Sequence, residues 1–180
     1  LAAGHNQYAP MAGLPALCGA IGESALRRHG WHIDPANEVT VTAGGTEAIF
    51  AAIHAVVRAG EEVILLDPSY DSYGPAAELA GARAVHVPLA IADFGIDWPR
   101  LEQAITPRTR LLIVNTPLNP AGSVLTAADW DRIADLLDGR DAYVLSDEVY
   151  EALVFDGRRH AGVVAAEDEE LHDPGAPGGD

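Results

Sequence analysis

Short apolar runs alternate with segments of helical periodicity along most of this chain, and this alternation constrains the fold more than any other feature. Strands are predicted at residues 39–43, 63–66, 82–87, 111–115 and 143–146. Helices are predicted at about 15–29, 46–58, 73–80, 99–105 and 127–137. Because strands joined by helices need crossover connections, the pattern predicts an α/β fold: three layers, with helices on both faces of a mostly parallel sheet.

The charge of the chain argues against two classes of partner. Nucleic acids and anionic membranes bind clustered basic residues, whereas this chain has 11 basic and 27 acidic residues and a formal net charge of −16. No apolar run approaches the roughly 20 residues that cross a bilayer. Cys18 is a single cysteine, so no intramolecular disulfide can form. We therefore expect a cytoplasmic protein that binds neither nucleic acid nor a membrane.

Residues 165–180 differ in composition from the rest of the chain. They contain six acids, several prolines and glycines, and no basic residue. Such a segment lacks the apolar content needed to pack, so we expect an acidic, Pro/Gly-rich disordered tail. Residues 1–164 are expected to form part of one domain. The chain begins at Leu1 rather than at methionine, which favours a cut N-terminus.

The segments that follow the predicted strands hold the candidate site, because ligands of open α/β sheets bind beyond the carboxyl ends of the strands. Gly44, Gly45 and Thr46 follow the first strand and open a helix, an arrangement that lets backbone N–H groups approach a phosphate. A tight turn with Thr46 as the helix cap is the alternative. Tyr70 follows the next strand and could stack on a flat cofactor, whereas Tyr73 is expected to cover the core or to lie at the surface.

Two later strand ends carry further polar groups. Asn115 and Asn119 lie in a loop stiffened by two prolines, although asparagine beside proline is often only a turn. Asp147 and Tyr150 follow the last strand. A metal ligand or a helix cap is the alternative for Asp147, but no histidine or cysteine with ligand spacing accompanies it. A phosphate cradle, an aromatic ring, an amide, a carboxylate and a phenol together suit pyridoxal phosphate.

Five ordered motifs also resemble a known family. They are Asn6–Pro10, Thr42–Ala48, Asp67–Tyr73, Asn115–Pro120 and Ser146–Tyr150. The chain is similar, from about residue 5 to residue 160, to the class I/II aminotransferases of fold type I, and within them to the methionine and kynurenine (glutamine) branch. The resemblance implies part of the large, cofactor-binding domain of a transaminase that uses pyridoxal phosphate.

The resemblance also implies a role for each residue around the cofactor phosphate and ring. Gly44, Gly45 and Thr46 would bind the phosphate, and Tyr70 would stack on the ring. It implies two substrates as well, an L-amino acid that is methionine, aromatic or glutamine-like, and a 2-oxo acid.

Four further residues have implied roles. Asn119 and Tyr150 would bond the ring oxygen, and Asn119 would also help to hold the substrate carboxylate. Asp147 would pair with the pyridine nitrogen. Tyr8 would reach the phosphate of the neighbouring subunit, which implies a homodimer.

The chain departs from the family in several respects, and the one that bears most directly on the chemistry is that it contains no lysine. Family members carry a Ser-x-x-Lys stretch some thirty residues after the motif that contains Asp147, and this lysine forms the Schiff base with the cofactor and moves the α-proton. Arginine cannot replace it, because arginine stays protonated at neutral pH. We therefore expect a truncated large domain without the C-terminal small domain and with little or no transaminase activity.

Three other functions are considered. A carbon–sulfur β-lyase uses the same cofactor pocket, and a non-catalytic remnant or dimerisation module would bind no cofactor. A nucleotide-binding domain is disfavoured, because the G-x-G-x-x-G fingerprint is absent. The seven histidines are scattered without the mutual spacing of a site, so most are expected to be solvated or to cap helices.

Overall fold

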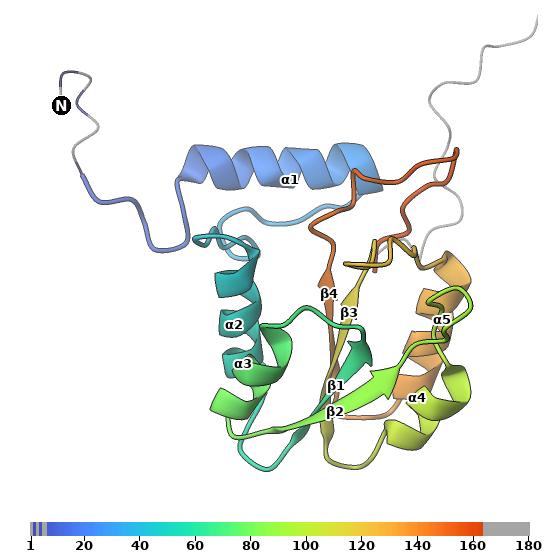
Figure 1. Cartoon of the computed structure of the whole chain (residues 1–180). Helices are drawn as coiled ribbons and strands as arrows, with labels where there is room; N and C mark the ends of the chain where they lie inside the picture. Colours follow the sequence, from blue (N-terminus) through green and yellow to red (C-terminus); the bar gives the residue numbers. More distant parts are fainter. Residues whose placement is uncertain (1, 3, 5–6, 164–180) are drawn as a thin grey trace, which may run out of the picture. The chain divides into compact units, whose positions relative to one another are not determined.

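A computed structural model describes residues 2, 4 and 7–163, which fall into two compact units (Figure 1). The described residues up to Val41 belong to one unit, and Thr42–Val163 form the other. The acidic tail predicted at 165–180 lies outside the described residues. The single domain predicted over 1–164 stays a prediction.

The smaller unit is built around helix α1 (Pro15–His29). Pro15 stands at the start of the helix, where its missing N–H costs nothing, and Gly30 ends it with a left-handed φ of 70°. Both confirm the predicted helix and its end. The apolar residues that recur near helical spacing in this segment, Leu17, Ile21 and Leu26, are exposed, whereas Cys18 is buried.

The strand predicted at residues 39–43 is wrong. The segment belongs to no ladder of the described sheet, although Val39 is buried. A strand needs a neighbour that takes its backbone groups, and the N–H of Val41 instead donates to the carbonyl of Ala12. A β-prone sequence is therefore extended here without being a strand.

The larger unit contains a four-stranded sheet in the order β2-β1-β3-β4, with every neighbouring pair parallel. The strands are β1 (Glu62–Asp67), β2 (Arg83–Pro88), β3 (Thr109–Asn115) and β4 (Tyr143–Asp147). They confirm four of the five predicted strands and the parallel α/β fold. All four carboxyl ends lie at the same end of the sheet, where polar residues were predicted to gather.

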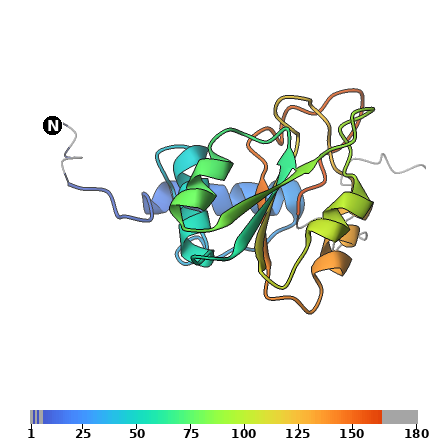
Figure 2. The same ribbon diagram turned by 60° about the horizontal axis from the view of Figure 1, so that its bottom comes forward.

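Helices cover both faces of this sheet (Figures 1 and 2). Helices α2 (Gly45–Val56) and α3 (Tyr73–Leu79) lie on one face, and α4 (Trp98–Ala104) and α5 (Ala127–Leu137) lie on the other. Helix α5 begins with a capping box, in which Thr126 and Asp129 each bond the other's backbone N–H. The three-layer arrangement is as predicted.

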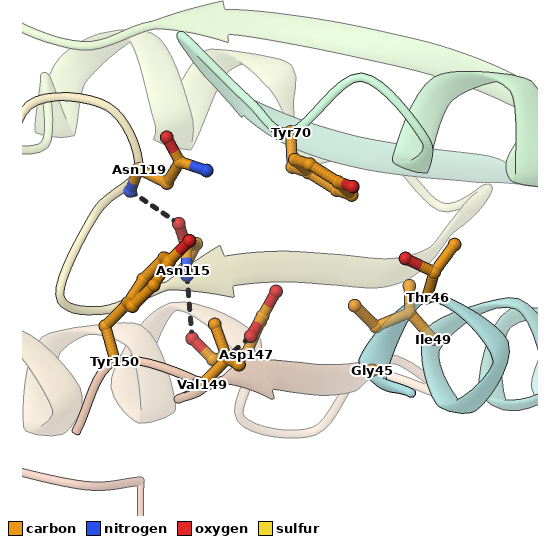
Figure 3. A pocket seen from close by; sticks show the side chains of 9 residues that line it. All are labelled: Gly45, Thr46, Ile49, Tyr70, Asn115, Asn119, Asp147, Val149 and Tyr150. Carbon is orange, nitrogen blue, oxygen red and sulfur yellow. Dashed lines mark hydrogen bonds between the residues drawn. The ribbon is translucent and has the colours of Figure 1, made fainter. Parts of the chain in front are cut away.

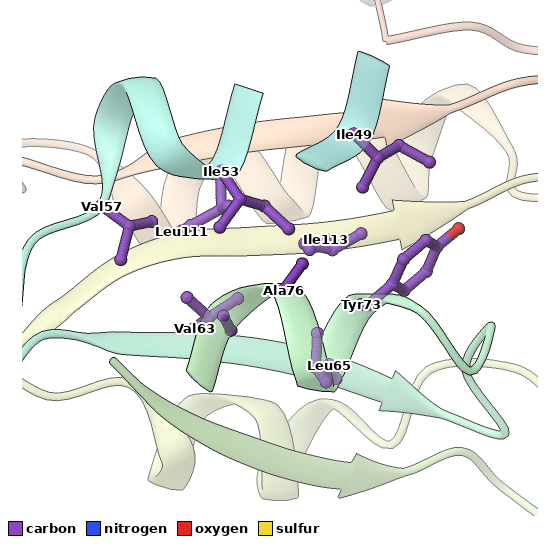
Figure 4. Close-up of a cluster of buried hydrophobic side chains, with 10 residues drawn as sticks. Ile49, Ile53, Val57, Val63, Leu65, Tyr73, Ala76, Leu111 and Ile113 are labelled. Carbon is purple, nitrogen blue, oxygen red and sulfur yellow. The ribbon is translucent and has the colours of Figure 1, made fainter. Parts of the chain in front are cut away.

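The core of the larger unit explains why its strands read as continuous apolar runs. A cluster between the sheet and helices α2 and α3 includes Ile53, Val63 and Leu111, all at most 1% exposed (Figure 4). Alternate strand residues such as Ile64 and Leu112, which point to the opposite face, are buried as well. A sheet buried on both faces needs apolar residues at every position, and the polar groups are left at its ends.

Among the described residues, no helix is both long enough and apolar enough to span a membrane.

Candidate functional site

A pocket of about 160 Å³ lies at the carboxyl end of the sheet (Figure 3). It is lined by Gly45, Thr46, Ile49, Tyr70, Asn115, Asn119, Asp147, Val149 and Tyr150. Six of these residues are among the eight that the sequence singled out for the cofactor. The structure therefore brings together segments that are up to about a hundred positions apart in the chain.

The glycine turn before α2 leaves open space beside its backbone. Gly44 has a φ of 98°, which residues with a side chain rarely adopt. A Cβ placed on Gly44 or Gly45 would meet no heavy atom within 4 Å. Gly45 is the first residue of α2 and lines the pocket. The free backbone N–H groups of the first helical turn and the positive end of the helix dipole therefore lie at the pocket. The turn has the geometry of an anion cradle, although Gly44 itself does not line the pocket.

Asp147, the last residue of β4, is held by a neutral donor. The phenol of Tyr73 donates a 2.5 Å hydrogen bond to Oδ2, and the N–H of Val149 donates to Oδ1 at 3.2 Å. Burial and the bond to Asp147 raise the pKa of the Tyr73 phenol far above its ordinary value, so the phenol remains a donor at every physiological pH. The carboxylate is fixed in orientation without being neutralised.

Tyr73 was not predicted as a site residue. Its side chain is only 2% exposed, so the expectation of a core residue is right and the alternative of a surface residue is wrong. It lies 74 positions from Asp147 in the sequence, and no local pattern links the two residues. Only its position three residues after Tyr70, at the first residue of α3, offered a signal.

The loop after β3 is tied to β4 by Asn115. Its Nδ2 donates to the carbonyl of Asp147 at 2.9 Å, and its Oδ1 accepts from the N–H of Asn119 at 2.7 Å. Asn115 is therefore a brace that fixes the backbone on both sides of the pocket. In the described part of the chain the Asn119 carboxamide makes no hydrogen bond, so its polar groups remain available at the pocket.

Two aromatic residues face the pocket from different segments. Tyr70 packs edge-on against Tyr73, with the ring centroids 5.8 Å apart. Tyr150 lies in a turn that is closed by a 2.8 Å bond from the N–H of Leu153 to the carbonyl of Tyr150. Each is a little over one third exposed, and within the described residues neither phenol makes a hydrogen bond. Figure 3 shows the Tyr70 ring across the pocket from Asp147.

Gly44 and Tyr8 are the two predicted residues that do not line the pocket. Tyr8 was predicted to reach the cofactor phosphate of a neighbouring subunit; it belongs to the other compact unit, its side chain is fully exposed, and its role stays a prediction. Three lining residues had no predicted role at the cofactor: Ile49, Asn115 and Val149. Ile49 lies on α2, one turn after the start of the helix. The described residues contain no group of histidine, cysteine, aspartate and glutamate suited to a metal ion.

Comparison with known proteins agrees with the family resemblance. Residues 2–173 match the family "Aminotransferase class I and II", whose members depend on pyridoxal phosphate. The methionine aminotransferase of Escherichia coli is 46% identical over 165 residues, which are 92% of this chain and 43% of that protein. Kynurenine–oxoglutarate transaminase 1 of Mus musculus is 34% identical over 171 residues, which are 89% of this chain and 40% of that protein.

A solved structure shows the same fold. The N-succinyldiaminopimelate aminotransferase of Mycobacterium tuberculosis superposes with a TM-score of 0.88 at 45% identity, covering 92% of this chain and 44% of that chain. The present chain thus spans less than half the length of the relatives that it matches. The family match, the identities and the shared fold together lead to one conclusion: the chain belongs to the class I and II aminotransferases.

Proposed function

We propose that this chain is a partial large domain of a pyridoxal-phosphate-dependent aminotransferase, over residues 1–164. The whole protein would move an amino group between an L-amino acid and a 2-oxo acid. One observation carries the proposal: an anion cradle, an aromatic ring and an unpaired carboxylate line the same pocket.

The cradle suits the cofactor phosphate. Gly44 and Gly45 leave room for an anion against the start of α2, and Thr46 adds a hydroxyl at the same point. A twelve-residue helix presents a partial positive charge there, which favours a phosphate over a neutral ligand. A side chain at either glycine would occupy the space that the phosphate needs.

The remaining wall suits a pyridine ring. Asp147 has no ion-pair partner in the described part of the chain, so its charge is available to a protonated ring nitrogen. The Tyr70 ring can cover one face of the pyridine, while the Asn119 amide and the Tyr150 phenol can donate to the ring oxygen. Bound pyridoxal phosphate supplies an electron sink that stabilises negative charge on the substrate α-carbon. The residues of this chain bind and orient the ring and keep its nitrogen protonated.

The pocket is too small to be a complete site. Its volume of about 160 Å³ lies below the roughly 300 Å³ at which ligand pockets usually begin. We propose that a second copy of the protein supplies part of the wall, with Tyr8 of each subunit reaching the phosphate of the other.

The free, buried thiol of Cys18 fits the reducing conditions of the cytoplasm, where we place the protein.

Cofactor titration tests the proposal on this chain. Pyridoxal phosphate should bind non-covalently and saturably, measured by its difference absorbance. Asp147→Asn should weaken binding about tenfold, because the ring nitrogen loses a charged partner. Asp156→Asn, the same change at an exposed position, should leave binding unaltered. Absence of saturable binding, or an equal loss in both variants, would refute the proposal.

The lack of lysine has its own test. After borohydride reduction with pyridoxal phosphate, no internal position should carry a stable label, because the chain has no side-chain amine. Stable labelling at one internal site would contradict this expectation.

An amino-acid panel separates transamination from β-lyase chemistry. The assay uses a full-length relative of this chain. For each amino acid it measures how much of the corresponding 2-oxo acid is formed, and how much pyruvate and thiol. The named relatives act on methionine, kynurenine and N-succinyldiaminopimelate respectively. We propose methionine, aromatic or glutamine-like donors for this protein, and dominant release of pyruvate with thiol would contradict transamination.

A further inference from the structure

Glu148 lies directly after Asp147 and has a separate set of partners. Successive residues of an extended chain point to opposite sides, so Glu148 faces away from the pocket and shares its side with Ser146. Its carboxylate accepts from the Ser146 hydroxyl at 2.7 Å and from Nε2–H of His160 at 2.7 Å. It also accepts from the N–H of Val163 at 3.1 Å. One side chain thus joins the end of β4 to a segment twelve to fifteen residues later.

The returning segment, residues 160–163, is fixed a second time by α5. Nε1–H of Trp130 donates to the carbonyl of Ala161 at 2.8 Å, and the Trp130 side chain is buried. A Cβ on Gly162 would lie 2.8 Å from Oε2 of Glu148, so a larger residue at this position would have to displace the carboxylate. The segment is therefore held against both the strand end and the helix.

His160 departs from the expectation that most histidines are solvated. Its side chain is 7% exposed, and its Nδ1 is buried without a hydrogen-bond partner in the described part of the chain. An unsatisfied buried nitrogen costs free energy, so contacts elsewhere must hold the ring in place. The bond to Glu148 is the one directed contact recorded for this ring among the described residues.

The pKa of the Glu148 carboxyl indicates that its hydrogen bond with His160 persists at neutral pH. Burial by itself raises the pKa of this carboxyl, but hydrogen bonds from His160, Ser146 and the N–H of Val163 outweigh burial and hold the pKa below its usual value. The carboxylate is therefore ionised at neutral pH and remains an acceptor for all three donors.

We propose that the Glu148–His160 pair is a positioning clasp, which closes the base of the loop 149–159 and thereby holds Val149 and Tyr150 at the pocket. Tyr73 fixes β4 through Asp147 on the pocket side, and the clasp fixes it through Glu148 on the opposite side. Neither Glu148 nor His160 lines the pocket. The effect on cofactor binding rests on the proposed function, whereas the effect on the loop does not.

Backbone hydrogen exchange of the full chain without ligand tests the clasp directly. Glu148→Ala and His160→Ala should exchange the amide of Leu153, which closes the Tyr150 turn, at least about tenfold faster. His160→Gln keeps an N–H donor near the position of Nε2 and should restore most of the protection. Ile133→Val, which trims the core side of α5 without touching the clasp, controls for a general loss of stability.

A pyridoxal phosphate titration of the same variants gives the second readout. Glu148→Ala and His160→Ala should bind about fivefold more weakly, while His160→Gln and Ile133→Val remain near the unaltered chain. Equal amide exchange in the alanine variants and Ile133→Val would overturn the clasp. Faster exchange with unchanged cofactor affinity would overturn its positioning role. If the unaltered chain binds no cofactor, the proposed function fails, and the exchange rates alone decide whether the clasp orders the loop.

Discussion

Glu62 and Asp147 are carboxylates at opposite ends of the same sheet, and their partners differ in kind. Glu62 opens β1 and accepts from Arg108 at 2.6 Å, from Arg83 at 2.8 Å and from the hydroxyl of Thr106 at 2.7 Å. Asp147 ends β4 and accepts from a neutral phenol. The charge of Glu62 is neutralised by arginines of the protein, whereas Asp147 is oriented by a neutral group and has no cationic partner among the described residues.

The difference also shows in what surrounds each group. The Glu62 side chain is 1% exposed, whereas Asp147 borders the pocket at the carboxyl end of the sheet. A buried carboxylate that meets two guanidinium groups stabilises the fold. Asp147 has no cationic partner among the described residues and faces a pocket, so its charge is accessible to a cationic group of a ligand. We therefore assign a structural role to the amino end of the sheet and propose the binding role for the carboxyl end.

The largest effect is expected at the amino end. Burial raises the pKa of Glu62, but bonds from Thr106, Arg83 and Arg108 outweigh burial and lower the pKa from 4.5 to about 2. Glu62→Gln removes this charge and should lower the free energy of unfolding by about 3 kcal/mol, measured by urea denaturation. Asp147→Asn, the same chemical change at the other end, should cost at most about 1 kcal/mol, because the Tyr73 phenol keeps an acceptor. Equal losses of unfolding free energy in the two variants would contradict the difference between the two ends of the sheet.

The acid sensitivity of the fold should follow from the same residue. A carboxyl whose pKa is lowered on folding contributes stability above its unfolded value of 4.5 and loses it as the pH falls toward about 2. Between pH 5 and pH 3 the chain should lose about 2 kcal/mol more than Glu62→Gln does. Urea midpoints at the two pH values give this difference, and parallel losses in both proteins would assign the sensitivity to other carboxyls.

The two glycines of the cradle should separate backbone strain from ligand binding. Gly44→Ala forces a residue with a side chain to a φ of 98° and should cost about 1–2 kcal/mol of stability. Gly45→Ala meets no atom within 4 Å in ordinary helical backbone, so its stability should change by no more than about 0.5 kcal/mol. Both should weaken pyridoxal phosphate binding in the absorbance titration. Unchanged binding in Gly45→Ala would show that the phosphate lies elsewhere.

A smaller effect than at Glu62 or Gly44 is expected at Tyr73. Tyr73→Phe removes the bond to Asp147 and should lower stability by about 1 kcal/mol. Tyr70→Phe is the matched control, because its phenol makes no hydrogen bond among the described residues, and it should be nearly neutral. Thermal unfolding of both variants distinguishes them, and equal behaviour would mean that the phenol does not orient Asp147.

Helices and strands were predicted correctly where the residues that determine them lie within the same short segment of the chain. Helix α5 was predicted with its observed bounds, because its capping residues and apolar spacing lie within one short segment. The strand at 39–43 failed, because pairing depends on a neighbour that local sequence does not reveal. On α1 the spacing of the apolar residues indicates a helix but not which of them are buried, and Leu17 and Ile21 are exposed.

The candidate site divides in the same way. Thr46, Tyr70, Asn119 and Asp147 could be named because each follows a strand or glycine turn, and parallel strands place such positions at one end of the sheet. The contacts that fix them could not be named. Tyr73 bonds Asp147 across 74 positions, and His160 bonds Glu148 on the far side of the strand.

By itself, the sequence determined the parallel α/β pattern, the order of the family motifs and the lack of a side-chain amine to bond the cofactor. These are properties of residue type and spacing along the chain. The tertiary structure alone decided the partners of each carboxylate: arginines for Glu62, the Tyr73 phenol for Asp147 and His160 for Glu148. Those outcomes depend on side chains that meet only after the sheet has formed, because hydrogen bonds act over about 3 Å and not along the sequence.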